Sequence, residues 1–535
     1  MKPVLIFMLI VSLCLAVTLT ASSEDGPNYT SMVYPGIDGK LVYAPDSLGN
    51  IIPDFSSAGY GGGGVMLPIV QNKVTIWGVE GDASPVIQAA IDSVSAMPLD
   101  ENGFRGAVLL RAGYYDLHST ITINASGVVL RGQGQDDLGT ILTGRGKQRG
   151  SMNSAGMIHV YGESGMVPDE DTAQKIVGDY VPVGTWTFTV ERARGFKVGD
   201  KVILRRVGNE EWISEIGMDG ADGNRTRWRP FTISYDRIIT AIDGNDITLD
   251  APLMCAIEEQ WGGGDIVKYE DTGRIENVGI ENLRAVSDFD QGVRTNRYTN
   301  IDRDPYIAEE YYSDENHWGN FIRINSAKNC WVRDITALHF VSSLVIVEKD
   351  AKWVTIQDCA NLEPVSMRSG ARRRAFCLDG QLTLCQRCTS DKGRHSFVTD
   401  WDEAAGPNVF LDCVATRSYG SSEPHNSWVT GELHDNVEGP QGVRFWKDFI
   451  IGWAGANTVF WNCEGEFRIQ SPPTAENYTF GHIGVNATAL NYSFIDNSKP
   501  DGYMESLDRH VTPRSLYLKQ LEDRLGPQAV SLIAK

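Results

Sequence analysis

The chain has 535 residues, of which 42% are hydrophobic and 22% are charged. This balance is typical of a folded globular protein and excludes a disordered one. The formal net charge is −21, which excludes broad nucleic-acid binding, because that needs a basic surface to displace counterions. The 55 glycines follow no three-residue period, so the chain is not collagen-like, and they indicate a fold with many turns.

The N-terminus has the pattern of a secretion signal. Lys2 supplies the positive start, residues 4–20 form an apolar run, and small residues follow at 21–23. The run is somewhat short for a membrane-spanning helix, although an uncleaved membrane anchor is the alternative. We therefore predict a cleaved signal peptide, a secreted or periplasmic location and no stable membrane insertion.

Six segments share one pattern: an apolar residue, any residue, a polar residue, then cysteine or an aliphatic residue. Their final positions are separated by 52, 24, 29, 25 and 50 residues. If the two long gaps hold two units each, every unit has 24 to 29 residues, which is a solenoid period. The runs between the marks are short and β-rich, so we predict an all-β protein with a right-handed parallel β-helix. The segments are 280–283, 332–335, 356–359, 385–388, 410–413 and 460–463.

Stacked coils account for the eight cysteines that follow the signal segment. Coils repeat at roughly 4.8 Å, so equivalent side chains lie on top of one another and cysteines can form an internal apolar stack. A disulfide is the alternative in an exported chain, while the single C-x-x-C pair, Cys385/Cys388, is a weak zinc signal. We expect a polar column at the corner where each coil turns, because Asn and Asp hydrogen-bond local backbone. Its members are Asn282, Asp334, Asp358, Arg387, Asp412 and Asn462.

The ends of a solenoid need covering, because an open end exposes strand edges. Helical stripes after Ser84-Pro85 and after Thr512-Pro513 predict short N- and C-terminal capping helices. Paired β runs around 243–246 predict an inserted antiparallel β subdomain. The expected segments are 1–23 (signal), 24–80 (extended), 81–174 (capping helix and first coils), 175–256 (inserted subdomain), 257–500 (main coils) and 501–535 (C-terminal helical segment).

Several stretches resemble pectate-lyase-like β-helix proteins, a group of secreted bacterial polysaccharide-degrading proteins. The resemblance covers most of the mature chain and implies a right-handed parallel β-helix and action on polysaccharides. The chain lacks the R-x-P-x-x-R motif of calcium pectate lyases and the Gly-His-Gly and paired-aspartate signatures of polygalacturonases, so their catalytic residues cannot be transferred. The matching stretches are 81–92, 106–115, 129–134, 393–399, 406–413 and 424–431.

Basic and imidazole residues follow equivalent corners of three consecutive coils, at 372–374, 391–395 and 424–428. We expect them to gather on one side and to bind an anionic, uronate-containing polysaccharide, because arginine binds carboxylates through paired hydrogen bonds and tryptophan stacks on sugars. The predicted catalytic residues are His395, His425, Arg394, Arg374 and Lys392. The predicted substrate-binding residues are Arg373, Trp428, Asn426, Trp401 and Asp435.

These residue types suit β-elimination, which removes the C5 proton of a uronate. Imidazoles can serve as base and acid, and arginines can neutralise the carboxylate as the enolate-like intermediate forms. We predict a secreted lyase that cleaves pectin-like glycans. One alternative is a glycoside hydrolase with paired carboxylates, Asp400 with Asp402 or Glu432 with Asp435. Another is a non-catalytic glycan-binding or surface protein.

No cofactor and no metal ligand set is predicted for this site. The acidic segment 302–315 offers the oxygen ligands that calcium takes, but acidic residues are common throughout the chain.

Overall fold

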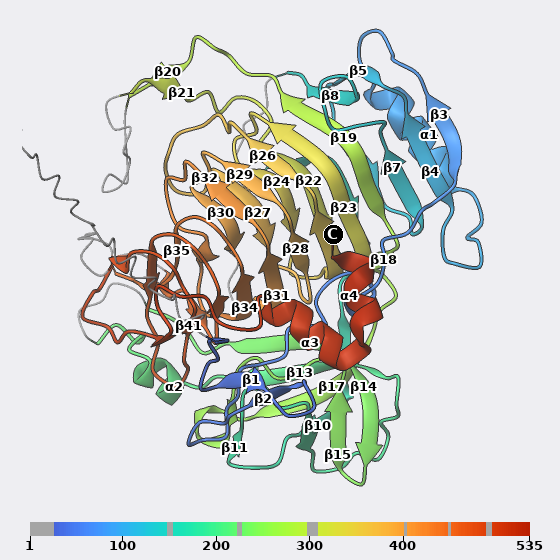
Figure 1. Cartoon of the computed structure of the whole chain (residues 1–535). Helices are drawn as coiled ribbons and strands as arrows, with labels where there is room; N and C mark the ends of the chain where they lie inside the picture. The colour runs from blue at the N-terminus through green and yellow to red at the C-terminus, as the bar shows by residue number, and fades with distance from the viewer. Residues whose placement is uncertain are drawn as a thin grey trace, which may run out of the picture.

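The computed structural model describes residues 26–146, 154–221, 227–296, 309–400, 404–447, 451–487 and 495–534. Most of them form a right-handed parallel β-helix, with an antiparallel β subdomain at its side (Figure 1). The predicted signal segment lies outside the described residues. Within the described ranges, no helix is long and apolar enough to cross a membrane.

Each coil contributes three short strands, which pair in parallel with those of the next coil. One coil consists of β25 (Lys352–Gln357), β26 (Ala360–Leu362) and β27 (Arg374–Leu378). The next coil pairs with it, strand by strand, through β28 (Leu384–Gln386), β29 (Thr389–Asp391) and β30 (His395–Thr399). The parallel register confirms the fold that the repeat predicts.

The third face of the coils is a seven-stranded parallel sheet, which carries the candidate site. Phe376 on β27 and Phe397 on β30 stack inside the helix with ring centroids 5.4 Å apart. Neighbouring residues on a strand point to opposite faces, so Cys377 and Val398 point outward. In spatial order the strands are β6 (Ile121–Ile123), β9 (Gly156–Tyr161), β22 (Asn320–Asn325), β24 (Ser343–Val347), β27, β30 and β33 (Glu423–Pro424).

The first two faces run together as one long sheet of nineteen strands. Besides those already given, its strands are β3 (Asn72–Ile76), β4 (Gly106–Leu110), β5 (Gly113–Leu117), β7 (Val128–Arg131), β8 (Thr140–Gly144), β18 (Ile275–Glu276), β19 (Gly279–Ser287), β23 (Ala327–Leu338), β31 (Ala405–Leu411), β32 (Val414–Thr416), β34 (Val429–Asp435), β38 (Gly455–Ala456), β39 (Val459–Trp461), β41 (Tyr478–Phe480) and β42 (Tyr503–Glu505). Short pairs outside the two large sheets are β1 (Val33–Pro35) with β2 (Leu41–Tyr43), β11 (Tyr180–Val181) with β16 (Ile257–Glu258), β20 (Arg294–Thr295) with β21 (Tyr311–Tyr312), β35 (Gln441–Val443) with β40 (Phe467–Ile469), and β36 (Phe445–Trp446) with β37 (Gly452–Trp453).

The polar column lies at the corner between the first two faces. All six predicted members have φ between 50° and 58°, in the left-handed region that Asn and Asp tolerate better than most residues. Asn436, with φ 53°, completes the column between Asp412 and Asn462. Arg387 adopts the same conformation without an amide or carboxylate, and its guanidinium binds Asp358 in the preceding coil, with Nε 2.9 Å from Oδ1.

The two long gaps in the repeat have different causes. Ile280 pairs directly with Val332, so the gap of 52 residues is one coil with a long loop, and its interpretation as two units is wrong. The gap of 50 does hold two coils, because Phe410 pairs with His434 and His434 pairs with Phe460. The middle coil escaped the pattern because His434 occupies the apolar position, whereas Asn436 and Val437 fit the pattern.

The cysteines are buried, and none of the eight within the described ranges is in a disulfide. The Cys388 thiol donates to the Ile356 carbonyl, and the Cys413 thiol donates to the Cys385 carbonyl. Each contact links one coil to the coil before it. Burial raises the pKa of Cys413 well above its ordinary value, so these thiols act as small apolar side chains.

The inserted subdomain is built around a six-stranded antiparallel sheet. The sheet runs from Val167 to Glu270, wider than the expected 175–256, because its first strand in the chain pairs with its last, and the last strand also pairs within the sheet. Buried ion pairs join it to the coils: Asp236 lies 2.8 Å from Arg274 and 3.0 Å from Lys352. The strands are β10 (Val167–Lys175), β12 (Thr187–Thr189), β13 (Lys201–Val207), β14 (Thr232–Asp243), β15 (Asp246–Leu249) and β17 (Gly264–Glu270).

Helices lie mainly near the two ends of the chain. Helix α1 (Ser84–Ser95) buries Ile87, Ile91 and Val94 against the first coils. Helix α3 (Leu516–Leu525) packs on outward residues of β31, β34 and β39, so it covers the side of the coils, with α4 (Pro527–Ile533) beside it (Figure 1). The other helical turns are η1 (Tyr60–Gly62), α2 (Glu210–Glu215) and η2 (Glu259–Trp261).

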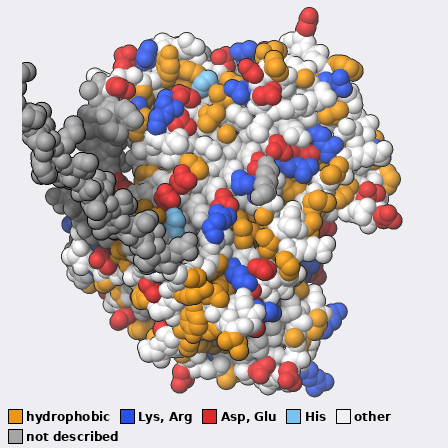
Figure 2. Space-filling model, in the orientation of Figure 1, with side chains coloured by type: hydrophobic (Ala, Val, Ile, Leu, Met, Phe, Trp, Pro, Cys, Tyr) orange, Lys and Arg blue, Asp and Glu red, His pale blue; other side chains and the backbone are white. Residues whose placement is uncertain are grey.

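Charged side chains of both signs are interspersed over the face that Figure 2 shows. The negative net charge is therefore not gathered into one acidic patch on that face.

Candidate functional site

The last strands of the seven-stranded sheet bring ionisable side chains to its outward face. Val398 on β30 pairs with Cys377 on β27 and with Glu423 on β33, so the Glu423 side chain points outward with them. An ionisable residue directly follows each of these strands: Asp379 follows β27, Asp400 follows β30 and His425 follows β33. The backbone N–H of Asp400 donates to Asp379 Oδ1 at 2.8 Å, so adjacent coils deliver these groups to one place.

We call His395, Glu423 and His425 the imidazole–carboxylate centre. The two imidazole rings lie 4.1 Å apart, centroid to centroid. Both face the same carboxylate oxygen: Glu423 Oε1 is 2.8 Å from Nδ1 of His425 and 3.4 Å from Nδ1 of His395. The other oxygen, Oε2, is bound by the Arg444 guanidinium. All three members of the centre are buried.

Hydrogen bonds fix which nitrogen of each imidazole carries the proton. Nδ1 of His395 lies 2.8 Å from the Ser421 carbonyl, which can only accept, so Nδ1 donates and Nε2 keeps the lone pair. His425 donates from Nδ1 to Glu423 in the same way. Within the described part of the chain, Nε2 of His395 has no hydrogen-bond partner. Each ring therefore keeps a basic nitrogen, Nε2, that is not used by these contacts.

The imidazoles are held in their neutral form. Burial lowers the pKa of His395 and of His425 well below the ordinary value for histidine, and nearby arginines, including Arg394, lower both further. Charging either ring would require a positive charge in a buried place that already holds cations. At neutral pH both rings are therefore able to accept a proton.

Three arginines surround the imidazole–carboxylate centre. Arg374 begins β27, pairs across the sheet with His395, and forms an ion pair with Asp400. Arg394 acts electrostatically on both imidazoles, and Arg444 binds Glu423. Arg374, Arg394, His395 and His425 are thus brought together, as the stacking of three coils predicts.

Sequence reasoning missed two members of the site. Glu423 stands two residues before His425, and this spacing on a strand puts both side chains on one face, so the signal was available. Arg444 comes from the following coil, and no local pattern indicated its partner. Asp400 was considered only in a pair with Asp402, which lies outside the described residues.

Two other predicted residues stabilise loops beside the centre. Lys392 binds Glu363 with Nζ 2.9 Å from Oε2, on the rim of the coil. Arg373 is buried and donates to the carbonyls of Ser366 and Lys392. Asn426 is half-buried beside His425, and its predicted role in substrate binding stays a prediction.

The prediction that Trp428 is an exposed sugar platform is wrong. Trp428 is fully buried, and its ring packs edge-on against Trp212 of the inserted subdomain, with centroids 4.9 Å apart. The insertion covers the loop position from which an exposed ring was inferred. Trp401, the other predicted aromatic, lies outside the described residues.

The predicted substrate-binding role of Asp435 is also wrong. Asp435 is fully buried at the end of β34, in the nineteen-stranded sheet. It accepts hydrogen bonds from the Ser515 hydroxyl at 2.7 Å and the Tyr517 backbone N–H at 2.8 Å, so it anchors the start of α3. Glu432 binds His434 at 2.6 Å on the opposite face of β34, so Glu432 and Asp435 are not a hydrolase pair.

The first half of the acidic segment proposed for calcium, 302–308, lies outside the described residues, which resume at 309. Within its described part, Glu315 binds Arg372, with Oε1 2.6 Å from Nε. Of the described residues, one group has three potential metal-ligand atoms within 4.8 Å of one another, and that group is His395, Glu423 and His425.

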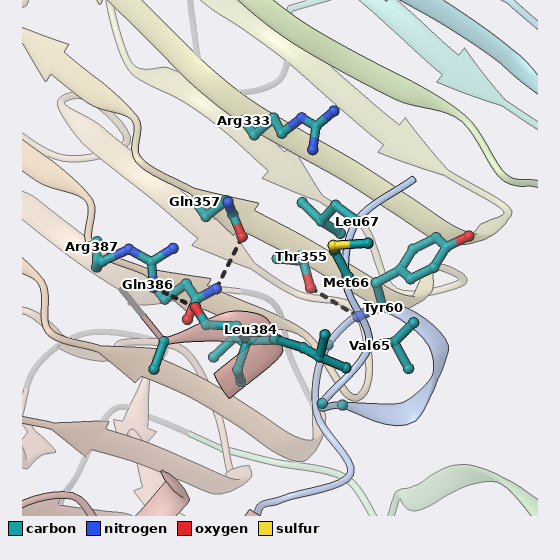
Figure 3. A pocket seen from close by; sticks show the side chains of 16 residues that line it. Tyr60, Val65, Met66, Leu67, Arg333, Thr355, Gln357, Leu384, Gln386 and Arg387 are labelled. Atoms are coloured by element: carbon teal, nitrogen blue, oxygen red, sulfur yellow. Dashed lines mark hydrogen bonds between the residues drawn. The ribbon is translucent and has the colours of Figure 1, made fainter. Parts of the chain in front are cut away.

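A separate cavity of about 170 Å³ lies on the outward side of the nineteen-stranded sheet, beneath the C-terminal segment (Figure 3). Its polar lining is occupied by internal contacts: Gln386 donates to Gln357 at 3.0 Å, and the Tyr60 N–H donates to Thr355. Arg333 binds Glu281 at 2.7 Å. These contacts engage polar groups of Gln357, Thr355 and Arg333 in the lining.

Comparisons with known proteins relate the chain to others by fold alone. No protein-family model matches the chain, and no curated protein matches it. Among solved structures, the tailspike gp49 from Pseudomonas phage LKA1 is similar with 13% identity and a TM-score of 0.41, over 75% of this chain and 55% of that one. The polygalacturonase from Erwinia carotovora ssp. carotovora has 10% identity and a TM-score of 0.32, over 84% of this chain and 96% of that one.

A third similar structure is the gp54 tailspike of Acinetobacter baumannii bacteriophage AP22, with 13% identity and a TM-score of 0.38, over 76% of this chain and 56% of that one. The chain thus spans little more than half the length of either tailspike. At these identities the likeness concerns architecture and assigns no activity. The chain is a right-handed parallel β-helix protein.

Proposed function

We propose that this protein cleaves polysaccharides at the imidazole–carboxylate centre, as a lyase acting on uronic-acid-containing glycans. One observation carries the proposal: two neutral imidazoles share Glu423 inside a ring of three arginines. β-Elimination needs a base for the C5 proton and positive charge for the adjacent carboxylate, and this centre offers both.

His425 is the base in this proposal. Arg444, Glu423 and His425 form a chain of contacts in which the carboxylate orients the ring and leaves Nε2 free to take a proton. As Nε2 takes the C5 proton, the Glu423 carboxylate stabilises the imidazolium that forms. The imidazolium can then give the proton to the departing glycosidic oxygen, so one proton serves both halves of the elimination. His395 lies beside it as a second neutral ring, with the ring centroids 4.1 Å apart.

The arginines supply the electrostatic part of the reaction. Removal of the C5 proton moves negative charge onto the uronate carboxylate, and a guanidinium can bind that carboxylate through two parallel hydrogen bonds. Arg394 is the proposed contact, because its charge acts on both imidazoles of the centre. The centre therefore favours an anionic sugar over a neutral one.

A specific observation also favours glycoside hydrolysis as a second candidate. Asp379 and Asp400 stand on adjacent coils beside the centre, linked by the 2.8 Å hydrogen bond from the Asp400 backbone. Within the described ranges, Asp400 Oδ1 has no hydrogen-bond partner. Paired carboxylates are the groups that hydrolysis requires.

One assay separates the candidate functions. The protein is incubated with pectic, alginate and other uronate glycans, and ultraviolet absorbance and reducing ends are both followed. Absorbance with new ends identifies a lyase, and new ends alone identify a hydrolase. Retained binding with neither signal identifies a glycan-binding protein and contradicts the proposal.

Matched variants test the site. His425→Ala is expected to lower kcat about 10² to 10⁴-fold, the usual contribution of a general base, while the melting temperature shows whether the fold survives. His425→Gln, which keeps a polar side chain, serves if the alanine variant unfolds. His510→Ala is the control, because His510 forms a similar contact with Glu464, 3.0 Å away on the surface. Full activity in folded His425 variants contradicts the assignment.

A further inference from the structure

We infer that His395, Glu423 and His425 also form a binding site for a divalent transition metal such as Zn²⁺, and that metal bound there blocks the enzyme. Two imidazole nitrogens and one carboxylate oxygen are the donor set that zinc accepts, and three protein ligands leave a coordination position open. The blocking effect rests on the proposed function, whereas metal binding does not.

The distances between the donor atoms support this site. Zinc binds nitrogen and carboxylate oxygen at about 2.0–2.1 Å, so ligand atoms in a tetrahedral site lie about 3.3 Å apart. Glu423 Oε1 is 3.4 Å from His395 Nδ1 and 2.8 Å from His425 Nδ1, and each of the three residues offers a potential ligand atom within 4.8 Å of those of the other two. The two separations from Glu423 Oε1 thus lie within about half an ångström of the tetrahedral value.

Neighbouring charged side chains orient the ligands and offset the charge around them. Arg444 binds Oε2 of Glu423 and so leaves Oε1 facing the imidazoles. The carboxylates of Asp379 and Asp400 stand alongside and offset the charge of Arg374 and Arg394. All three ligand side chains are buried, which excludes bulk water from competing for the donor atoms.

Metal binding and proton transfer exclude each other at this centre. Coordination through Nδ1 requires each imidazole to carry its proton on Nε2 instead. Nε2 then has no lone pair with which to accept the C5 proton. His395 also gives up its 2.8 Å hydrogen bond to the Ser421 carbonyl, which should keep the affinity below that of a site built for zinc alone.

Other histidine–carboxylate contacts provide internal controls. His510 with Glu464, 3.0 Å apart, and His434 with Glu432, 2.6 Å apart, each combine a single imidazole with a single carboxylate. Neither belongs to a group of three potential ligands among the described residues. A single imidazole–carboxylate pair should hold the ion far more weakly than the set of three.

The test uses the full chain after treatment with a chelator. Titration with Zn²⁺ by calorimetry and with Co²⁺ by visible absorption is expected to give one site per chain. His395→Ala, His425→Ala and Glu423→Gln should each weaken binding by at least about 100-fold, while His510→Ala should leave it unchanged. If an alanine variant unfolds, the matching glutamine variant replaces it.

Activity supplies a separate readout. Stoichiometric Zn²⁺ should abolish uronate cleavage by the wild-type chain, and chelator should restore it. No binding at one ion per chain, or binding that survives all three substitutions, would overturn the site. Activation by Zn²⁺ would overturn the blocking effect. Metal binding in a chain that cleaves no glycan would leave the metal site standing and remove the proposed function.

Discussion

Asp435→Asn should make the protein more stable at neutral pH, although it removes a carboxylate that anchors α3. Burial raises the pKa of Asp435 from 3.8 to about 7, even though the Ser515 hydroxyl and the Tyr517 backbone N–H donate to it. The folded state therefore holds this proton more tightly than the unfolded state does. Its stabilising contribution is full below about pH 4 and is lost as the pH rises to about 7.

The pKa difference sets the size of the effect. A difference of about three units at about 1.4 kcal/mol each corresponds to about 4 kcal/mol of unfolding free energy lost between pH 4 and pH 8. Asparagine is neutral throughout, and its Oδ1 can accept from Ser515 and Tyr517. Its amide group would face the amide of Asn436, which donates to Asp435 at 2.6 Å, and this conflict costs about 1 kcal/mol. The expected gain at pH 8 is thus about 3 kcal/mol.

Urea unfolding of both proteins at several pH values between 4 and 8 measures this difference. Other titrating groups contribute equally to both chains, so they cancel when the variant is compared with the wild type. The variant should be slightly less stable at pH 4 and clearly more stable at pH 8. A difference that stays constant across this range would show that Asp435 is ionised in the folded state and would refute the reasoning.

Three further substitutions test the architecture. Asn462→Ala should lower the unfolding free energy by about 2–3 kcal/mol in urea, because the Asn462 amide donates to three carbonyls of the C-terminal segment; an unchanged midpoint would contradict the role of the corner. Trp428→Ala should destabilise the fold by about 3–5 kcal/mol through lost packing against Trp212, and the folded fraction should bind glycan as tightly as the wild type. Weaker glycan binding by a variant of unchanged stability would show that Trp428 binds sugar. Glu423→Gln should lower the melting temperature more than Glu423→Gln combined with Arg444→Gln, because the single change leaves Arg444 buried without its carboxylate; equal melting temperatures would mean that the pair is not coupled.

The fold could be predicted from the repeat because the repeat reflects a conformation that the backbone must adopt in each coil. A left-handed residue recurs at one corner of each coil, and Asn or Asp fills it in most coils, so the pattern is visible without any alignment. The pattern failed for one coil although Asn436 fills its corner, because His434 stands at the apolar position. It also failed where the long loop after Ser287 imitates a second coil.

The candidate site could be predicted only in part, because stacking determines which coils are neighbours but not what covers them. His395 and His425 follow equivalent corners of adjacent coils, and the structure places their rings 4.1 Å apart. Trp428 follows the same corner, yet the inserted subdomain buries it. Sequence periodicity contains no information about where a subdomain 200 residues earlier folds back, so exposure could not be inferred from loop position.

The energetic cost of the centre itself argues that it serves a reaction. The outward positions that precede Glu423 in the same row of the sheet hold apolar side chains, Cys377 and Val398. Replacing a buried ion pair by apolar residues is often neutral or stabilising, so the fold does not require Glu423 and Arg444 on the outward face. The hydrogen bonds at the centre also hold both imidazoles in the tautomer that exposes a basic Nε2, which packing alone has no reason to select. Proton transfer requires bases that stay neutral. The buried charges of this centre, which the fold does not require, are arranged to keep two bases neutral.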